Sequence, residues 1–281
     1  YTPAEIAARV SAGGVTKARL PLSTLFLLGI MAGGFVGIGA LYFTIIVSDS
    51  ELSFALARLI GGICFSIGLL LVVVCGAELF TGNILIAMAW ADGSIRFTEL
   101  LRNWGVVCLA NFIGAAGFAL LVFLSGHWEL NGGAVGATYL KIAAAKAGLP
   151  FWQAFFLGVL CNNLVCLAIW MSFAGRTVVD KFIGVVLPIS AFVAAGFEHS
   201  IANMYFFPMA LLLQASGSYS QNGLHDITTS DIAGNLIPVI SGNIVGGSIL
   251  VALIYWLIYR KNIKSNCIFR RKYIFYMVWP Y

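Results

Sequence analysis

Two segments of the chain carry the same pattern of chemically active side chains, Gly-x-Glu-x4-Asn, within otherwise uncharged hydrophobic sequence. They are residues 76–83 and residues 196–203. A carboxylate in the interior of a membrane is costly, so its presence there indicates a function. Many transporters build their substrate sites from interrupted membrane helices near the middle of the bilayer. The repeated pattern therefore predicts two broken membrane helices beside a pore.

The acidic and amide side chains of this pattern are predicted to hold the breaks together. A broken helix leaves backbone N–H groups without partners, and a carboxylate can accept hydrogen bonds from several of them. We therefore expect Glu78 and Glu198 to brace the two loops, with Asn83 and Asn203 bridging backbone groups in the same way. Thr81 lies in the first break, where its hydroxyl could contact a permeating molecule.

His199 is the histidine that falls within a predicted membrane segment, whereas His127 and His225 fall in predicted outer loops. An imidazole can change its protonation near neutral pH. Burial disfavours its charged form, but a carboxylate beside it, here Glu198, favours that form. A neutral, hydrogen-bonded structural histidine is the alternative. The position inside the broken-helix pattern favours a functional role.

Large apolar side chains near these polar groups predict a narrow passage. Phe65 and Leu69 are four residues apart and would share a helix face, and Phe192 would share a face with His199, seven residues later. Apolar rings next to a polar centre would form a constriction that strips water from an ion. Helix packing or lipid contact is the alternative, and spacing alone does not decide between them.

The composition is that of a polytopic membrane protein. Of the 281 residues, 60% are hydrophobic and 10% are charged, whereas a soluble domain carries about 25% charged residues. Five of the six cysteines lie in apolar stretches and do not form a disulfide pattern, and the net charge of +5 lies mostly at helix ends, so nucleic-acid binding is not expected. No HExxH motif occurs, so a membrane zinc protease is unsupported. No metal or cofactor is expected.

Uncharged runs long enough to cross a bilayer predict six membrane segments. They cover residues 22–48, 59–91 with a break at Glu78, 103–126, 147–175, 182–224 with a break at Glu198, and 232–259. The two patterns lie 120 residues apart, and residues 111–114 resemble residues 243–246. We therefore expect two three-helix repeats, at about 22–126 and 147–260, of which the second is inverted. Coincidence between short motifs is the alternative.

The distribution of Lys and Arg predicts that both termini are cytoplasmic. With that orientation, 13 basic residues lie inside and 3 lie outside. The outer three are Arg58, Lys141 and Lys146. Before the first span, residues 2–12 are predicted to form a short helix, with Thr2 and Glu5 as a capping box and Gly13 and Gly14 ending the helix.

The longest motifs resemble those of the formate/nitrite transporter family, most closely its formate-channel branch. The similarity runs from about residue 3 to residue 260. It is most specific at residues 59–69 (LIGGICFSIGL), 75–81 (CGAELFT), 166–172 (CLAIWMS), 196–204 (GFEHSIANM) and 235–238 (NLIP). The resemblance implies an all-α, aquaporin-like protomer of six membrane helices, with the second and fifth broken, in a homopentamer with one pore per subunit.

The resemblance also implies roles for particular residues. The pore and selectivity set is Phe65, Leu69, Leu79, Phe80, Thr81, Phe192, His199 and Asn243. Phe65 and Phe192 match the outer constriction, and His199 matches the central histidine. Lys146 matches a vestibule lysine, with Glu198 and Asn203 as its acidic and amide partners. Asn243 matches a pore-facing asparagine of the sixth helix.

The function implied is pH-modulated passage of formate and similar small monovalent anions, acetate among them, across the lipid bilayer of a bacterial cytoplasmic membrane. Passage of nitrite or hydrosulfide is an alternative, because the sequence TGN at residues 81–83 is also compatible with nitrite-channel relatives. An intramembrane enzyme using Glu198 and His199 for acid–base chemistry is the alternative from another class. The channel domain is expected to end near residue 260. Residues 261–281 form an aromatic and basic tail that departs from the family pattern.

Overall fold

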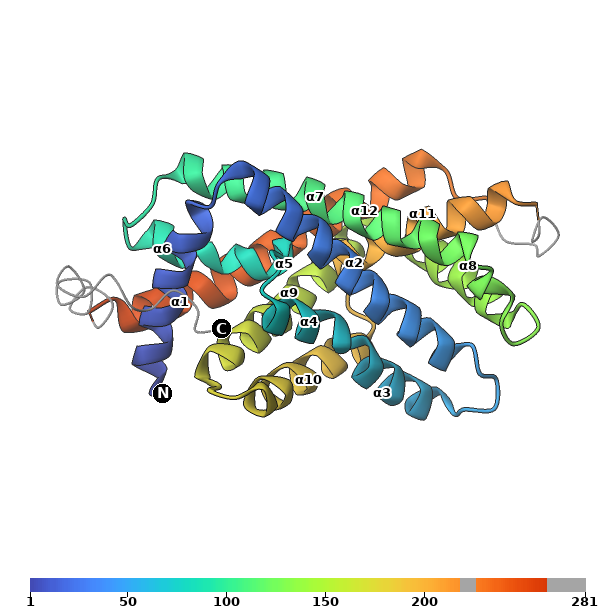
Figure 1. Ribbon diagram of the computed structural model, residues 1–281, viewed down its shortest axis with the longest axis horizontal. Coiled ribbons are helices and arrows are strands. Elements are labelled where there is room, and N and C mark those ends of the chain that lie inside the picture. Colours follow the sequence, from blue (N-terminus) through green and yellow to red (C-terminus); the bar gives the residue numbers. More distant parts are fainter. Residues whose placement is uncertain (218–225, 262–281) are drawn as a thin grey trace.

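The computed structural model describes residues 1–217 and 226–261, and all regular elements within these ranges are helical (Figure 1). They are α1 (Pro3–Ala18), α2 (Leu22–Val47), α3 (Phe54–Phe65), α4 (Ile67–Cys75), α5 (Phe80–Asn83), η1 (Ile84–Ile86), α6 (Ala87–Ala91), α7 (Phe97–Leu124), η2 (His127–Glu129), α8 (Ala134–Ala147), α9 (Phe151–Ala174), α10 (Val178–Ala195), α11 (Ser200–Ala215), α12 (Thr229–Gly247) and η3 (Ser248–Leu253). His225 and residues 262–281 of the predicted tail lie outside the described residues.

The predicted all-α membrane fold is confirmed. Six helices in the described ranges are long and apolar enough to cross a bilayer. They are Leu22–Val47, Phe54–Cys75, Phe97–Leu124, Phe151–Ala174, Val178–Ala195 and Thr229–Lys261. The helices α1 and α8 lie at opposite ends of the long axis of the molecule (Figure 1), and we call these ends the α1 side and the α8 side.

Two of these helices stop at a glycine and continue as a second, shorter helix. After α4 the chain turns at Gly76, whose φ angle is 78°, and α5 begins at Phe80. After α10 it turns at Gly196, with a φ angle of 75°, and α11 begins at Ser200. Glycine adopts positive φ without steric cost, which makes it the usual residue just after a helix end. The backbone between the two helical pieces is therefore free to contact side chains from other elements.

Close approach of backbones pairs α2 with α7 and α9 with α12. A Cβ atom on Gly33 would collide with the backbone of Asn111, and one on Gly114 would collide with the backbone of Ile30. In the other pair, a Cβ atom on Gly246 would collide with the backbone of Val159. Small residues allow such packing between membrane helices. The two segments with matching sequences, 111–114 and 243–246, thus lie at equivalent helix contacts.

The prediction that α1 ends at Gly13 and Gly14 is wrong, because the helix continues to Ala18. A Cβ atom on Gly14 would lie 3.1 Å from Cβ of Ala89 and 3.4 Å from Cα of Ile86. This glycine therefore serves to pack α1 against the half-helix that follows the first break. The predicted capping box of Thr2 and Glu5 is present.

Candidate functional site

A lysine, a glutamate and two asparagines form a closed network at the first break. The Lys17 ammonium donates to Glu78 Oε1 at 2.7 Å and to Asn83 Oδ1 at 3.1 Å. The Asn83 amide donates to Glu78 Oε2 at 2.6 Å and to Asn103 Oδ1 at 3.0 Å, and Asn103 donates to the carbonyl of Lys17 at 3.0 Å. Glu78 is buried. Its charge is thus balanced by a cation on α1.

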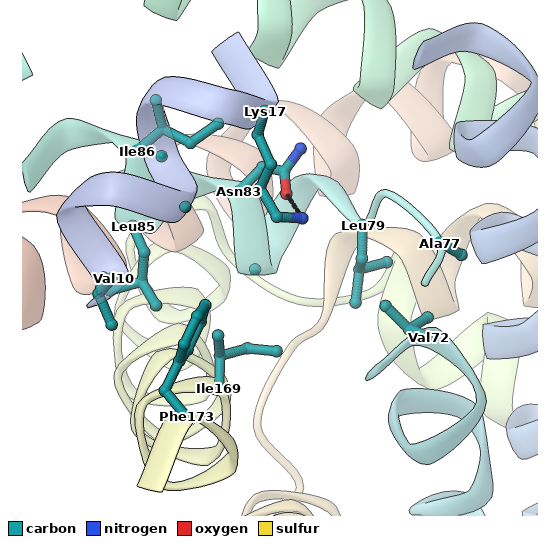
Figure 2. A pocket seen from close by; sticks show the side chains of 13 residues that line it. Val10, Lys17, Val72, Ala77, Leu79, Asn83, Leu85, Ile86, Ile169 and Phe173 are labelled. Carbon is teal, nitrogen blue, oxygen red and sulfur yellow. Dashed lines mark hydrogen bonds between the residues drawn. The ribbon is translucent and has the colours of Figure 1, made fainter. Parts of the chain in front are cut away.

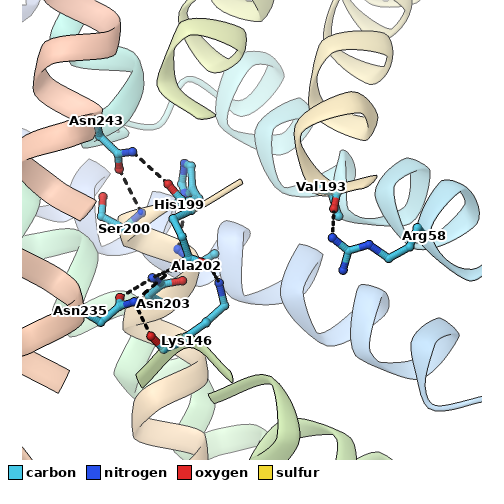
Figure 3. Close-up of polar contacts among 10 residues, drawn as sticks. Arg58, Lys146, Val193, His199, Ser200, Ala202, Asn203, Asn235 and Asn243 are labelled. Atoms are coloured by element: carbon cyan, nitrogen blue, oxygen red, sulfur yellow. Dashed lines mark hydrogen bonds and ion pairs between the residues drawn. The ribbon is translucent and has the colours of Figure 1, made fainter. Parts of the chain in front are cut away.

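The second break repeats this arrangement with residues from other elements (Figure 3). Lys146 donates to Glu198 Oε1 at 2.7 Å, and Asn203 donates to Glu198 Oε2 at 2.6 Å. Asn203 also donates to Asn235 Oδ1 at 2.7 Å, and Asn235 donates to the carbonyl of Lys146 at 2.8 Å. Two contacts differ. Asn203 Oδ1 is buried without a hydrogen-bond partner among the described residues, and Asn235 also donates to Glu198 Oε2 at 3.5 Å.

The prediction that Glu78 and Glu198 accept hydrogen bonds from free backbone N–H groups is wrong. So is the prediction that Asn83 and Asn203 bridge backbone groups, because both amides bind other side chains. Both carboxylates accept from lysine and asparagine side chains. A buried carboxylate needs an opposite charge to offset the loss of its hydration, and a neutral N–H group does not provide one. The lysines provide this charge, one from each side of the protein.

The free backbone groups of the breaks are bound instead by Asn111 and Asn243. Asn111 accepts from the N–H of Phe80 at 2.8 Å and donates to the carbonyl of Glu78 at 2.9 Å. Asn243 accepts from the N–H of Ser200 at 3.0 Å and donates to the carbonyl of Glu198 at 3.0 Å. Both asparagines are completely buried. The side chain of Asn243 is therefore occupied by the break.

Thr81 and His199 meet between the two breaks. Thr81 Oγ1 lies 3.0 Å from His199 Nε2, and the N–H of Ala202 donates to His199 Nδ1 at 3.1 Å. Because Nδ1 accepts, the proton of the neutral ring is assigned to Nε2, which donates to the threonine. His199 is thereby the N-terminal capping residue of α11. The sequence pattern placed Thr81 in the first break, whereas it lies in α5, just after the break.

Two phenylalanine rings lie next to this pair. The Phe65 and Phe192 rings meet edge to face with centroids 5.8 Å apart, and the Phe192 ring stacks on His199 with centroids 5.8 Å apart. The predicted reason for the second contact, a shared helix face, is wrong, because α10 ends at Ala195. The turn at the break folds His199 back toward Phe192. Leu69, Leu79 and Phe80 are buried in the same hydrophobic cluster.

A pocket opens beside the first break on the α1 side (Figure 2). Its lining is mostly apolar, with Lys17 and Asn83 as its polar side chains. Leu79 of the break and Phe173 of α9 contribute to the apolar part. The pocket therefore connects the α1 side of the protein with the backbone of the first break.

Sequence reasoning missed Lys17, Asn103 and Asn235 as members of the two networks. The lysines had a usable signal, since residues 17–21 read KARLP and residues 146–150 read KAGLP, each directly before a membrane helix. The asparagines had none, because Asn103 follows its partner Asn83 by 20 residues whereas Asn235 follows its partner by 32.

Comparisons with known proteins agree with this architecture. A family model described as formate/nitrite transporter matches residues 4–257. The chain is 45% identical to the protein named "Formate channel FocA" of Escherichia coli (strain K12), covering 92% of this chain and 95% of the relative. It is 39% identical to "Formate channel FocA" of Haemophilus influenzae, covering 81% of this chain and 84% of the relative.

Solved structures give the same assignment. A structure titled "Pentameric formate channel with formate bound" superposes with a TM-score of 0.79 at 39% identity, over 85% of this chain and 98% of that one. A second, titled "FNT family ion channel", superposes with a TM-score of 0.80 at 30% identity, over 90% and 98% of the two chains. The chain belongs to the formate/nitrite transporter family.

Proposed function

We propose that this protein is a channel for formate and related small monovalent anions in a bacterial cytoplasmic membrane. The observation that carries this proposal is the Thr81–His199 contact, which joins the two breaks, each with a part-buried lysine–glutamate pair. Relatives named as formate channels support the choice of substrate.

The proposed path begins at a lysine on either side of the membrane. From the distribution of basic residues we propose that the α1 side is cytoplasmic. Lys146 would then attract an anion from outside, and Lys17, with 29% of its side chain exposed, would attract one from the cytoplasm. Each ammonium is partly neutralised by its glutamate, so the anion is attracted without being trapped.

The middle of the path is proposed to be apolar on both sides of a polar centre. Phe65 and Phe192 form the constriction toward the α8 side, and Leu69, Leu79 and Phe80 form the one toward the α1 side. Between them, Thr81 and His199 offer an anion hydrogen bonds in place of water. The proposed pore role of Asn243 is indirect, because its amide holds the backbone of the second break.

We propose that pH acts on transport through the cap that His199 forms on α11. A second proton on the ring must go to Nδ1, which the N–H of Ala202 now occupies. Protonation therefore requires that this hydrogen bond breaks, and an anion next to the ring would offset the new charge. The proton could then pass to the anion, which would move on as a neutral acid. Such uptake avoids a potential worth about 2.3 kcal/mol per 100 mV.

The proposed assembly is a homopentamer with one pore per subunit, after the pentameric structure to which the chain is similar. Two further proposals concern the protomer, namely an inverted repeat of about 22–126 and 147–260 and an aquaporin-like arrangement. The matching contacts of Asn111 and Asn243 support the repeat. An enzyme is set aside, because the relatives are named as channels and transporters and because Glu198 is occupied by Lys146 and Asn203.

Reconstituted protein tests the proposal. Liposomes containing the purified protein should release formate down its gradient, faster than protein-free liposomes and without a second substrate. Nitrite, hydrosulfide and acetate measured in the same preparation establish the order of preference. Formate release no faster than in protein-free liposomes, from protein that is pentameric by sizing, would refute the proposed function.

A further inference from the structure

Arg58 of α3 binds the end of α10, just before the second break (Figure 3). Its Nη2 donates to the carbonyl of Val193 at 2.6 Å, and its Nε donates to the carbonyl of Ala194 at 3.1 Å. The last carbonyls of a helix lack partners within the helix, and they form the negative end of its dipole. Arg58 therefore supplies both hydrogen bonds and a positive charge at the point where α10 stops.

The same side chain joins the two helices that carry the phenylalanine rings. Arg58 precedes Phe65 by seven residues, two helical turns, so both lie on one face of α3. Its acceptor Val193 directly follows Phe192 in α10. The two rings are 5.8 Å apart. The Arg58 guanidinium thus fixes the backbone next to Phe192 relative to the helix that carries Phe65.

The Arg58 guanidinium packs closely against Phe43 and Gly196. Its guanidinium carbon lies 5.8 Å from the centre of the Phe43 ring of α2. A Cβ atom on Gly196 would lie 3.0 Å from Nη2, so the glycine of the break leaves room for the guanidinium group. A planar guanidinium that donates to two acceptors and packs on a ring is not replaced by the single ammonium of lysine.

The first break has no such clamp among the described residues. At the end of α4 the carbonyl of Val72 accepts from the backbone N–H groups of Gly76 and Ala77, and no Lys or Arg side chain of residues 1–217 or 226–261 binds a carbonyl there. Arg58 therefore distinguishes the α8 side of the passage from the α1 side.

We propose that Arg58 is a positioning residue for anion permeation, which holds the Phe65 and Phe192 rings at their spacing and offsets the negative end of α10 where an anion enters. This inference rests on the proposed function, since it assumes that anions enter from the α8 side through the constriction of Phe65 and Phe192. It gives Arg58 two separable effects. The two-acceptor hydrogen bonding controls which anions fit, and the positive charge controls how fast anions arrive from the α8 side.

Two substitutions separate these effects. In Arg58→Lys the charge remains but one of the two hydrogen bonds is lost. Flux of acetate relative to formate should rise several-fold, while the dependence of formate flux on ionic strength stays that of the parent. In Arg58→Gln the charge is lost as well. Formate flux from the α8 side at low ionic strength should fall about two- to fivefold, the equivalent of about 0.3–1 kcal/mol for a charge at a helix end, and salt should reduce flux less than in the parent.

Two further variants keep the test decisive. Lys141→Gln removes an exposed cation from α8 and should change neither selectivity nor flux by as much as Arg58→Gln does. Phe43→Leu removes the ring under Arg58 and should shift the acetate-to-formate ratio in the same direction as Arg58→Lys, by less. Both Arg58 variants are checked for pentamers by sizing.

The inference is overturned if Arg58→Lys and Phe43→Leu both keep the parent's acetate-to-formate ratio, or if both Arg58 variants fail to assemble while Phe43→Leu leaves that ratio unchanged. The proposed function survives either result, because the parent would still release formate. A parent protein that releases no formate would remove both.

Discussion

The hydroxyl oxygen of Thr81 and Nε2 of His199 lie 3.0 Å apart, although 118 residues separate them in the chain. This contact joins α5 to α11, the two helices that resume after the breaks. Both side chains are buried, and the other ring nitrogen of His199 caps α11 through Ala202. The proton on Nε2 is therefore directed toward the threonine. A second proton, on Nδ1, would break the hydrogen bond that caps α11.

Thr81→Val should reduce formate flux while keeping the pentamer. Valine has nearly the same shape but no hydroxyl, so the buried N–H of His199 loses its acceptor. An unsatisfied buried donor costs about 1–3 kcal/mol, and an anion in the passage loses one hydrogen-bonding group. Thermal unfolding and liposome flux measure the two effects. Thr138→Val is the control, because that hydroxyl bonds within α8. Flux equal to that of the control would refute a pore role for Thr81.

Substitutions of His199 should separate its cap from its proton chemistry. Asparagine is a good capping residue, so His199→Asn should keep α11 stable, pass anions and respond weakly to pH. His199→Phe should lose the cap, at a cost of about 1 kcal/mol, and should lose proton-linked uptake. Formate flux in both directions across a pH series is the measurement. An unchanged pH profile of uptake in His199→Phe would show that the histidine is structural.

Lys17 and Glu78 should behave as a coupled pair. Lys17→Met leaves a buried carboxylate without its cation, and we expect a loss of about 3 kcal/mol, at the low end for buried pairs because Lys17 is 29% exposed. Adding Glu78→Gln should restore part of that loss. Thermal unfolding of the single and double variants measures the coupling. Arg19→Met is the control, since its ion pair with Glu99 is long, at 3.4 Å, and Arg19 is 58% exposed, so its loss should cost under about 1 kcal/mol. Additive losses in the Lys17 and Glu78 variants would contradict the coupling.

Both termini are predicted to be cytoplasmic. Reporter fusions at residue 260 and within residues 127–146 test this, because the first should report the cytoplasm and the second the periplasm. The basis is the excess of basic residues on the α1 side. A periplasmic signal from residue 260 would reverse the assignment of inner and outer lysines.

The sequence predicted the membrane helices well because each is a long, uncharged, apolar run that can be recognised locally. The glycine and glutamate of each break were visible for the same reason, since a charge and a flexible residue stand out in apolar sequence. Contacts between distant elements were not visible. The sequence predicted a helix end at Gly14, whereas this glycine allows α1 to pack closely on Ile86 and Ala89. The sequence identified Lys17 only as a cytoplasmic cation, whereas α1 brings its ammonium into contact with the Glu78 carboxylate.

The site shows the same division between residue type and pairing. Sequence selected His199 and Phe192, but it related them through a helix face that the break at Gly196 interrupts. It could not show that Asn111 and Asn243 bind the breaks, because both lie on other helices. Such pairing depends on how α7 and α12 cross the breaks, which short motifs do not encode.

The Phe65 and Phe192 rings should set the size limit of the passage. Both are buried and meet edge to face, and the Phe192 ring stacks on His199. Replacing either ring with alanine removes several carbon atoms from one wall, and the double variant opens both walls. We expect acetate and larger monocarboxylates to gain on formate in each single variant and more in the double variant.

Comparing the loss of stability with the change in size selectivity distinguishes a selectivity role of the two rings from a packing role. Burial alone predicts a loss of about 3–5 kcal/mol for each Phe→Ala change, whatever happens to selectivity. Phe207→Ala is the control, because that ring is completely buried on α11 and takes no part in the ring pair. A double variant that assembles, is less stable and still has the parent's size selectivity would assign both rings to packing. A larger size limit in the Phe65 and Phe192 variants, but not in the control, would place the selective step between α3 and α10, where Arg58 binds the end of α10.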